Sequence, residues 1–211
     1  MIEYVVEHNV DDRVLKRACA YLNQGGLVAY PTDSSWGIGA SVLSKPGLER
    51  LKKLKGTLAF TPTLLCSGFS QWSDYAEVTN AVFKIAKKHL PGPYVFVLPT
   101  LGSAEKKWGL KRQEVGLRIP QHDVPRQLVE ALGHPVFSLT ASHQMSEPGW
   151  WDSAWAEEIL FEYGGEVDEI PGIELVLDTG EPLPKVLTTV VDFTGGEPTL
   201  LRQGLGPWPF V

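Results

Sequence analysis

Residues 25–39 read GGLVAYPTDSSWGIG, and the predicted architecture of the chain follows from this stretch. After the Gly-Gly break, residues 27–30 are apolar or aromatic without interruption, which is typical of a short strand buried on both faces. Pro31 ends that strand because proline has no N–H to donate to the hydrogen-bond ladder. We therefore expect residues 27–31 to belong to an α/β sheet.

Polar side chains follow this strand at once, namely three hydroxyls and one carboxylate from Thr32, Ser34, Ser35 and Asp33. In an α/β sheet, polar groups just beyond the carboxyl end of a strand are where a ligand is expected. Gly37 and Gly39 would let the backbone pass close to such a ligand. A Ser/Thr-rich turn beside the core is the alternative. A dinucleotide-binding fingerprint is excluded, because Val42 stands where its third glycine would fall.

The other elements follow from apolar periodicity and from the residues that start or stop helices and strands. Strands are expected at residues 63–66, 94–98, 115–119, 135–140, 174–178, 188–193 and 199–202, and helices at 11–23, 46–55, 80–89, 124–132 and 152–163. Residues 100–114 show no clear period and are expected to form a surface loop. We expect the strands from 27–31 to 188–193 to share one continuous sheet.

Length and composition describe an ordinary globular chain. Its 211 residues suit one domain, and its net charge of −6 argues against a mainly electrostatic grip on nucleic acid, although a local basic patch stays open. Cys19 lies in a helical pattern and Cys66 at the end of an apolar strand, so we expect two core thiols rather than a disulfide. The absence of a signal peptide and of a membrane-spanning run makes the cytoplasm the expected compartment, without membrane partners.

A few polar side chains interrupt the apolar elements. Arg118 lies inside an apolar strand, where an arginine either bridges a structural carboxylate or receives an anionic ligand. Ser138, Thr140 and Ser142 share one face by strand periodicity, and there they meet either a ligand or the neighbouring backbone. Lys55 ends its predicted helix beside a glycine and can swing toward a ligand, whereas the other basic residues of that helix are typical of a solvated face.

Several sequence motifs for catalysis and for metal or phosphate binding are absent, and their absence limits the kinds of reaction to be expected. The sequence has no phosphate-cradling P-loop, no His/Cys spacing for zinc and no nucleophile elbow, and its five histidines are scattered. We therefore expect neither a covalent nucleophile nor a metal site. Hydroxyls at strand ends and the lone cations Lys55, Arg118 and Arg202 remain, and this set suits the binding and orienting of an anionic small molecule.

From about residue 12 to residue 204, the chain resembles the threonylcarbamoyl-AMP synthase family, in its YciO-like branch more than its YrdC branch. The resemblance rests on residues 26–33, 37–39, 54–55, 91–93, 116–120, 138–142, 188–192 and 201–204. It implies a single YrdC-like domain over residues 1–211, with 205–211 as a C-terminal tail. The implied fold is a twisted open α/β sheet of mixed strands with a concave cavity.

The resemblance also implies a reaction. Synthases of this family join L-threonine, bicarbonate and ATP to give threonylcarbamoyl-AMP and pyrophosphate, on the way to modified adenosine 37 of transfer RNA. The threonine nitrogen takes up CO2 as a carbamate, and a carbamate oxygen then attacks the α-phosphorus. Such a reaction needs positioning and charge neutralisation rather than a covalent intermediate, and Mg²⁺ is expected with the triphosphate.

Site residues carry over by position. The threonine end would be held by Thr32, Arg118, Ser138 and Thr189, with the forked guanidinium on the carboxylate. The nucleotide would face Lys55, Thr57, Thr140, Ser142 and Arg202. Three departures stand against the family pattern: its Lys-x-Arg is here Lys55-Gly56-Thr57, its Ser-x-Asn is Thr140-Ala141-Ser142, and the histidine of many synthases is Cys66.

The missing arginine predicts weaker phosphate binding. Because a charge-assisted hydrogen bond contributes about 1.5–3 kcal/mol, its loss predicts a decrease in ATP affinity of about ten- to a hundredfold. The expected function is thus an ATP- and threonine-binding protein with weak or altered synthase activity. In one alternative, cations from Lys52, Lys53 or the 106–112 loop replace the arginine in a working synthase.

A second alternative is a protein of the same fold that binds transfer RNA or ribosomal RNA without synthase activity. Its support is a cluster of basic residues, Arg50, Lys52, Lys53 and Lys55 together with Lys106, Lys107, Lys111 and Arg112. The acidic balance of the chain weakens this alternative, and a steep salt dependence of RNA binding would support it.

Overall fold

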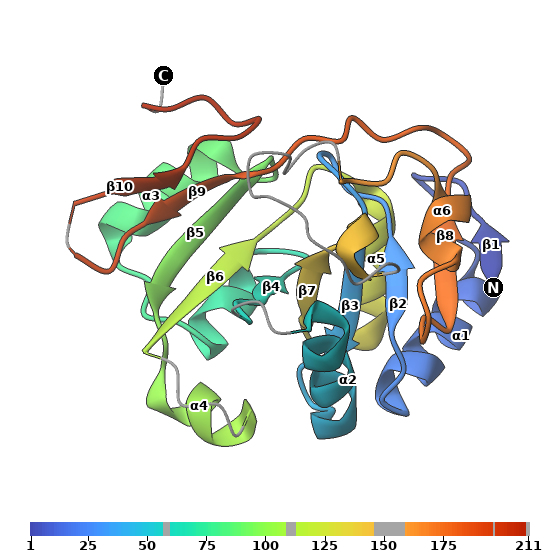
Figure 1. The fold of residues 1–211 in the computed structure, drawn as a ribbon. Coiled ribbons are helices and arrows are strands. Elements are labelled where there is room, and N and C mark those ends of the chain that lie inside the picture. The colour runs from blue at the N-terminus through green and yellow to red at the C-terminus, as the bar shows by residue number, and fades with distance from the viewer. Residues whose placement is uncertain (57–59, 109–112, 146–158, 196, 210–211) are drawn as a thin grey trace.

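One mixed sheet runs through the computed structural model, which describes residues 1–56, 60–108, 113–145, 159–195 and 197–209 (Figure 1). Across these ranges its strand order is β1-β8-β2-β3-β7-β4-β6-β5-β9-β10. The strands are β1 Ile2–Tyr4, β2 Val28–Tyr30, β3 Gly37–Ser41, β4 Thr63–Leu65, β5 Tyr94–Pro99, β6 Glu114–Arg118, β7 Val136–Thr140, β8 Leu175–Asp178, β9 Thr189–Asp192 and β10 Thr199–Arg202.

Pairing in this sheet is both parallel and antiparallel. For example, β2 runs parallel to β8 and antiparallel to β3, and β4 runs parallel to β6 and antiparallel to β7. Each strand predicted between 27–31 and 188–193 lies in this one sheet, with ends that differ by a residue or two. The predicted α/β fold with a mixed sheet is therefore confirmed.

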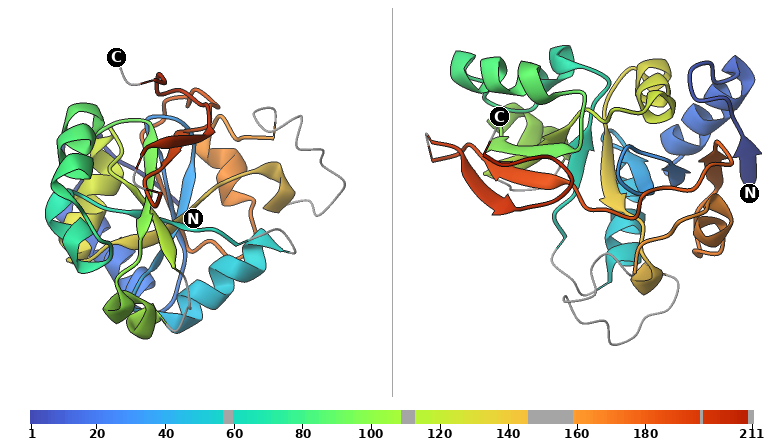
Figure 2. Two further views of the ribbon diagram at one scale, coloured as in Figure 1. Left: turned by 90° about the vertical axis from the view of Figure 1, so that its left-hand side faces the viewer. Right: turned by 90° about the horizontal axis from the view of Figure 1, so that it is seen from above.

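The helices are α1 Asp12–Asn23, α2 Lys45–Lys55, α3 Asn80–His89, α4 Gly102–Trp108, α5 Asp123–Leu132 and α6 Gly164–Asp168. Alternate residues of β2 divide the core: Val28 and Tyr30 pack with α1 and α5, while Leu27 and Ala29 face the cluster that contains α2. Figure 2 shows α1 and α5 on the opposite side of the sheet from α2. Among the described helices, none has the length and apolarity needed to cross a membrane.

Two expectations about local structure were wrong. Within residues 100–114, helix α4 forms because Ala104 and Trp108, four residues apart, bury the same helical face. Trp108 there stacks on Tyr75 with ring centroids 5.6 Å apart. A helix was also predicted at 152–163, and its residues up to 158 lie outside the described part of the structure. Residues 159–163 are not helical, and Leu160 there forms an isolated β-bridge with Ser142, which follows β7. The two thiols are free, as predicted.

Strand β3 depends on two glycines that make room for Tyr30. A Cβ atom on Gly37 would lie 2.6 Å from Cε2 of Tyr30, and one on Gly39 would lie 2.9 Å from its Cε1. Both distances are shorter than side-chain packing allows. These glycines were expected to pass close to a ligand, but the group that they accommodate is the buried aromatic ring of the neighbouring strand.

We expect Gly37→Ala to destabilise the protein by about 1–3 kcal/mol, because the added methyl group overpacks the buried Tyr30 ring. Urea unfolding followed by tryptophan fluorescence measures this change. The control is Gly165→Ala in α6, where a Cβ would meet open space and a helix gains from alanine. Equal stability of the two variants would show that Tyr30 does not require a glycine beside it.

Candidate functional site

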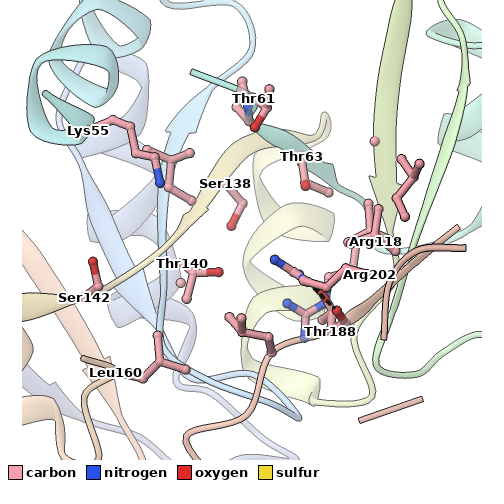
Figure 3. Close-up of a pocket in the computed structure, with 18 of the residues that line it drawn as sticks. Lys55, Thr61, Thr63, Arg118, Ser138, Thr140, Ser142, Leu160, Thr188 and Arg202 are labelled. Carbon is pink, nitrogen blue, oxygen red and sulfur yellow. Dashed lines mark hydrogen bonds between the residues drawn. The ribbon is translucent and has the colours of Figure 1, made fainter. Parts of the chain in front are cut away.

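A cavity of about 440 Å³ opens between the central strands and the C-terminal hairpin (Figure 3). Its polar lining consists of hydroxyls from Thr61, Thr63, Ser138, Thr140, Ser142 and Thr188, the amide of Gln144, cations from Lys55, Arg118 and Arg202, and the carboxylate of Glu114. In Figure 3, Lys55 approaches from one side, and the guanidinium groups of Arg118 and Arg202 approach from the other. Cations therefore outnumber carboxylates around a space that suits an anion.

Strand geometry places the hydroxyls. Ser138 and Thr140 stand two residues apart on β7 and so face the same side of the sheet. Thr63 of β4 pairs directly with Ser138, which adds a third hydroxyl from the neighbouring strand. Ser142 follows β7 and forms a bridge with Leu160, another lining residue. The predicted face of alternating hydroxyls thus borders the cavity.

Arg118 occupies the end of β6, almost completely buried. Its Nη2 atom donates to Ser34 Oγ at 2.9 Å and to Thr32 Oγ1 at 3.1 Å, and it forms an ion pair with Asp33. Its Nε has no acceptor among the described residues. The sequence left two alternatives for Arg118, and its ion pair with Asp33 confirms the one in which it bridges a structural carboxylate. Arg118 also lines the cavity, and its contact with an anionic ligand stays a prediction.

Arg202 and Lys55 bring the other two positive charges. Arg202 donates from Nε to the Thr188 carbonyl at 3.0 Å and from Nη2 to Thr188 Oγ1 at 2.9 Å, which holds its guanidinium at the cavity. Burial and then the charge of Arg118 lower the pKa of Arg202. Burial and then the charge of Arg202 lower the pKa of Lys55. The charged form of each side chain is thus disfavoured by its surroundings, and the attraction of a bound anion would offset this effect.

This electrostatic arrangement predicts a pH dependence. Because the pKa of Lys55 is lowered, the affinity of this cavity for a polyanion should decline as pH rises through that lowered pKa, before an ordinary lysine with a pKa of about 10.4 would lose its proton. Calorimetric titrations with Mg·ATP between about pH 7 and pH 10 measure this decline. Lys55→Arg should hold its affinity constant over the same range, since a guanidinium keeps its proton. Parallel profiles for both proteins would exclude Lys55 as the titrating group.

The structure brings together six of the predicted site residues: Lys55, Arg118, Ser138, Thr140, Ser142 and Arg202. Thr57 lies outside the described residues. Thr32 stands behind Arg118 and donates from Oγ1 to the Ser35 carbonyl at 2.6 Å. Thr189 is completely buried and donates to the Gly206 carbonyl at 2.6 Å. Their assignment to threonine stays a prediction, and neither is among the described residues that line the cavity.

Several lining residues carried too weak a signal in the sequence. Thr188 lines the cavity, whereas Thr189 was the predicted site residue. Adjacent residues of a strand face opposite sides of the sheet, and the sequence does not show which of the two threonines faces the cavity. Thr61 and Thr63 sit beside Pro62 before β4, where a threonine equally suits an ordinary strand start. The partnership of Asp33 with Arg118 joins residues 85 positions apart and has no local signature.

The basic cluster proposed for RNA is partly neutralised. Arg50 donates to Glu174 Oε1 at 2.6 Å and to the Gly25 carbonyl at 3.1 Å. Lys52 pairs with Glu49 at 2.6 Å. The side chains of Lys106, Lys107, Lys111 and Arg112 lie outside the described part of the structure. Of the four cluster residues on α2, Arg50 and Lys52 are therefore engaged with carboxylates of the protein itself.

The fold and the cavity define an α/β protein with a pocket lined by three cations and several hydroxyls. Residues 20–204 match the Sua5/YciO/YrdC family model, whose description is "Telomere recombination". The chain belongs to this Sua5/YciO/YrdC family.

Comparisons with known proteins place it near YciO. It is 31% identical over 207 residues to the uncharacterized protein YciO of Escherichia coli strain K12, covering 96% of this chain and 95% of YciO. The crystal structure of E. coli YciO superposes with a TM-score of 0.82 at 27% identity, over 100% of this chain and 99% of YciO. The predicted likeness to the YciO-like branch is thereby confirmed.

A more distant similarity connects the chain to an enzyme. It is 27% identical over 201 residues to the threonylcarbamoyl-AMP synthase of Pyrococcus abyssi, covering 94% of this chain and 56% of that protein. The crystal structure of P. abyssi Sua5 complexed with L-threonine has a TM-score of 0.79 at 26% identity, over 97% of this chain and 57% of that one. The chain thus spans only about half the length of these two relatives.

Proposed function

We propose that the protein binds L-threonine and Mg·ATP in the cavity lined by Lys55, Arg118 and Arg202, and that it forms threonylcarbamoyl-AMP weakly or in an altered reaction. The convergence of these three cations with a face of hydroxyls on one cavity carries the proposal. The substrate class is suggested by the similarity to the threonylcarbamoyl-AMP synthase of P. abyssi and to the structure of P. abyssi Sua5 complexed with L-threonine.

The threonine carboxylate would meet Arg118. Asp33, Thr32 and Ser34 all engage the Nη2 atom of this arginine, so they fix its plane. Its Nε has no acceptor among the described residues, so the remaining N–H groups would be available to a ligand carboxylate, whose fork matches the guanidinium. Held there, the threonine amine would add to CO2 formed from bicarbonate; the proton that the amine loses balances the one that bicarbonate takes up as it releases water. The resulting carbamate has an oxygen available for attack.

The triphosphate would lie between Lys55 and Arg202, with Thr140 and Ser142 as hydroxyl donors. Attack of the carbamate oxygen on the α-phosphorus forms the new P–O bond, and pyrophosphate leaves with the electrons of the broken bond. The cations offset the charge that develops on the phosphate oxygens, and Mg²⁺ enters with the triphosphate. No group of the protein needs to form a covalent intermediate.

Charge also explains why the activity is proposed to be weak. Position 57 is threonine instead of arginine, which leaves Lys55 and Arg202 for the phosphates. Asp33 offsets part of the charge of Arg118, and Glu114 adds a negative group at the cavity. We infer that the net positive potential is smaller than a site with a further arginine would have.

The test is product formation. The purified protein is incubated with ATP, L-threonine and ¹³C-bicarbonate, and pyrophosphate and the labelled adenylate are followed by mass spectrometry. Slow formation that needs all three substrates supports the proposal. If ATP and L-threonine both fail to bind, while transfer RNA binds with a steep salt dependence, the RNA-binding alternative replaces it.

A further inference from the structure

The hydroxyl of Tyr30 reaches the cavity wall from inside the core. Tyr30 of β2 is completely buried, and its side chain extends beneath Gly37 and Gly39 of β3. Its hydroxyl lies 2.8 Å from Oγ of Ser138, on the far side of β3 in strand β7. Ser138 also lines the cavity, so one oxygen atom connects the buried phenol with the space for the ligand.

The direction of this hydrogen bond follows from burial. Ser138 lines the cavity and can exchange hydrogen bonds with whatever occupies it, whereas Tyr30 is completely buried and its hydroxyl has Ser138 Oγ as its recorded partner. A buried hydroxyl that kept its proton unbonded would pay the full desolvation cost, so the phenol donates and Ser138 Oγ accepts. Burial also raises the pKa of Tyr30, which keeps this donor protonated at any physiological pH.

A serine hydroxyl has one proton and two lone pairs. With one lone pair occupied by the Tyr30 proton, the proton of Ser138 is left to point away from Tyr30, toward the cavity. We propose that Tyr30 is a positioning residue that commits Ser138 to donate, so that this part of the cavity selects an anionic oxygen, of a carboxylate or a phosphate, over an N–H group. The inference rests on the proposed function and specifies the ligand atom that Ser138 meets.

The experiment compares two ligands in two proteins. L-threonine presents carboxylate oxygens, whereas L-threoninamide replaces one of them with an NH₂ group. In Tyr30→Phe the Ser138 hydroxyl is free to rotate and to accept from the amide. We expect the preference for L-threonine over L-threoninamide, measured by calorimetry, to fall by about three- to tenfold. A purely structural defect would weaken both ligands together and leave the ratio unchanged.

Tyr75→Phe is the matched control. Tyr75 is also a buried tyrosine, but it stacks on Trp108 and is outside the set of described residues lining the cavity. Its ratio of ligand affinities should equal that of the parent. In a Ser138→Ala background, Tyr30→Phe should no longer change the ratio, because the residue through which it acts is gone. Thermal unfolding of each variant establishes that the titrated protein is folded.

The outcomes separate this inference from the proposed function. If L-threonine does not bind the parent but pyrophosphate does, the proposed substrate is wrong, and the inference is tested by a three- to tenfold loss of pyrophosphate affinity in Tyr30→Phe, about the contribution of one hydrogen bond. The inference is overturned if Tyr30→Phe leaves the ratio of L-threonine to L-threoninamide affinity unchanged. It is also overturned if Tyr30→Phe lowers this ratio equally in the Ser138→Ala background. Failure of both anions to bind overturns it too, because it requires an anionic acceptor at Ser138.

Discussion

Replacement of Arg118 by methionine should abolish L-threonine binding and also destabilise the fold. The Asp33 carboxylate, which is mostly shielded from solvent, would keep the Gln121 N–H but lose its charged partner, which costs up to about 3–5 kcal/mol of unfolding free energy. L-threonine would lose its charged hydrogen bonds to the guanidinium, and its affinity should fall by about a hundredfold or more. Calorimetry measures the binding, and urea denaturation measures the stability.

A second substitution separates these two effects. Asp33→Asn in the Arg118→Met background removes the uncompensated charge, so stability should recover while binding stays lost. Retention of the parent's threonine affinity in Arg118→Met would contradict the carboxylate site. Recovery of threonine binding in the double variant would show that Arg118 acts only on the fold.

ATP binding should respond in opposite directions to two changes at the end of α2. Lys55→Ala removes a cation at the cavity and should abolish measurable binding of Mg·ATP. Thr57→Arg supplies the family's missing cation and should tighten binding by about ten- to a hundredfold, the contribution of one charge-assisted hydrogen bond to phosphate. Both affinities are measured by calorimetry at one fixed ionic strength.

Lys53→Ala is the control for a general effect of charge. Lys53 is on the same helix but exposed, so its removal should leave ATP affinity close to that of the parent. If the parent, Lys55→Ala and Thr57→Arg bind ATP equally, the phosphates do not lie at this end of α2. The nucleotide assignment would then be abandoned.

Much of the sheet could be predicted because its strands are short apolar runs between clear breaks. The strand at 27–31 is an example: glycines precede it, a proline follows it, and it is buried on both faces as expected. Strand β3 carried no such signal, because four of the five residues in its sequence GIGAS are glycine, alanine or serine. It is a strand because its glycines accommodate Tyr30, and this requirement comes from the tertiary structure.

The kinds of side chain at the site could be predicted from the sequence, but only some of the individual residues could. A lone arginine in an apolar strand and hydroxyls at alternate positions are strong local signals, and Arg118, Ser138 and Thr140 do line the cavity. Pairings across the fold, such as Asp33 with Arg118, depend on which strands become neighbours. Helix α4 was missed because seven residues give too few turns for a period to emerge.

The central claim, that one cavity binds both ligands, is tested most directly by titrating L-threonine into the protein saturated with Mg·ATP. We predict saturable binding of about one L-threonine per chain with ATP still bound, and loss of that binding in Arg118→Met/Asp33→Asn. Absence of any heat of binding for L-threonine, with and without Mg·ATP, in a folded parent protein would contradict the account.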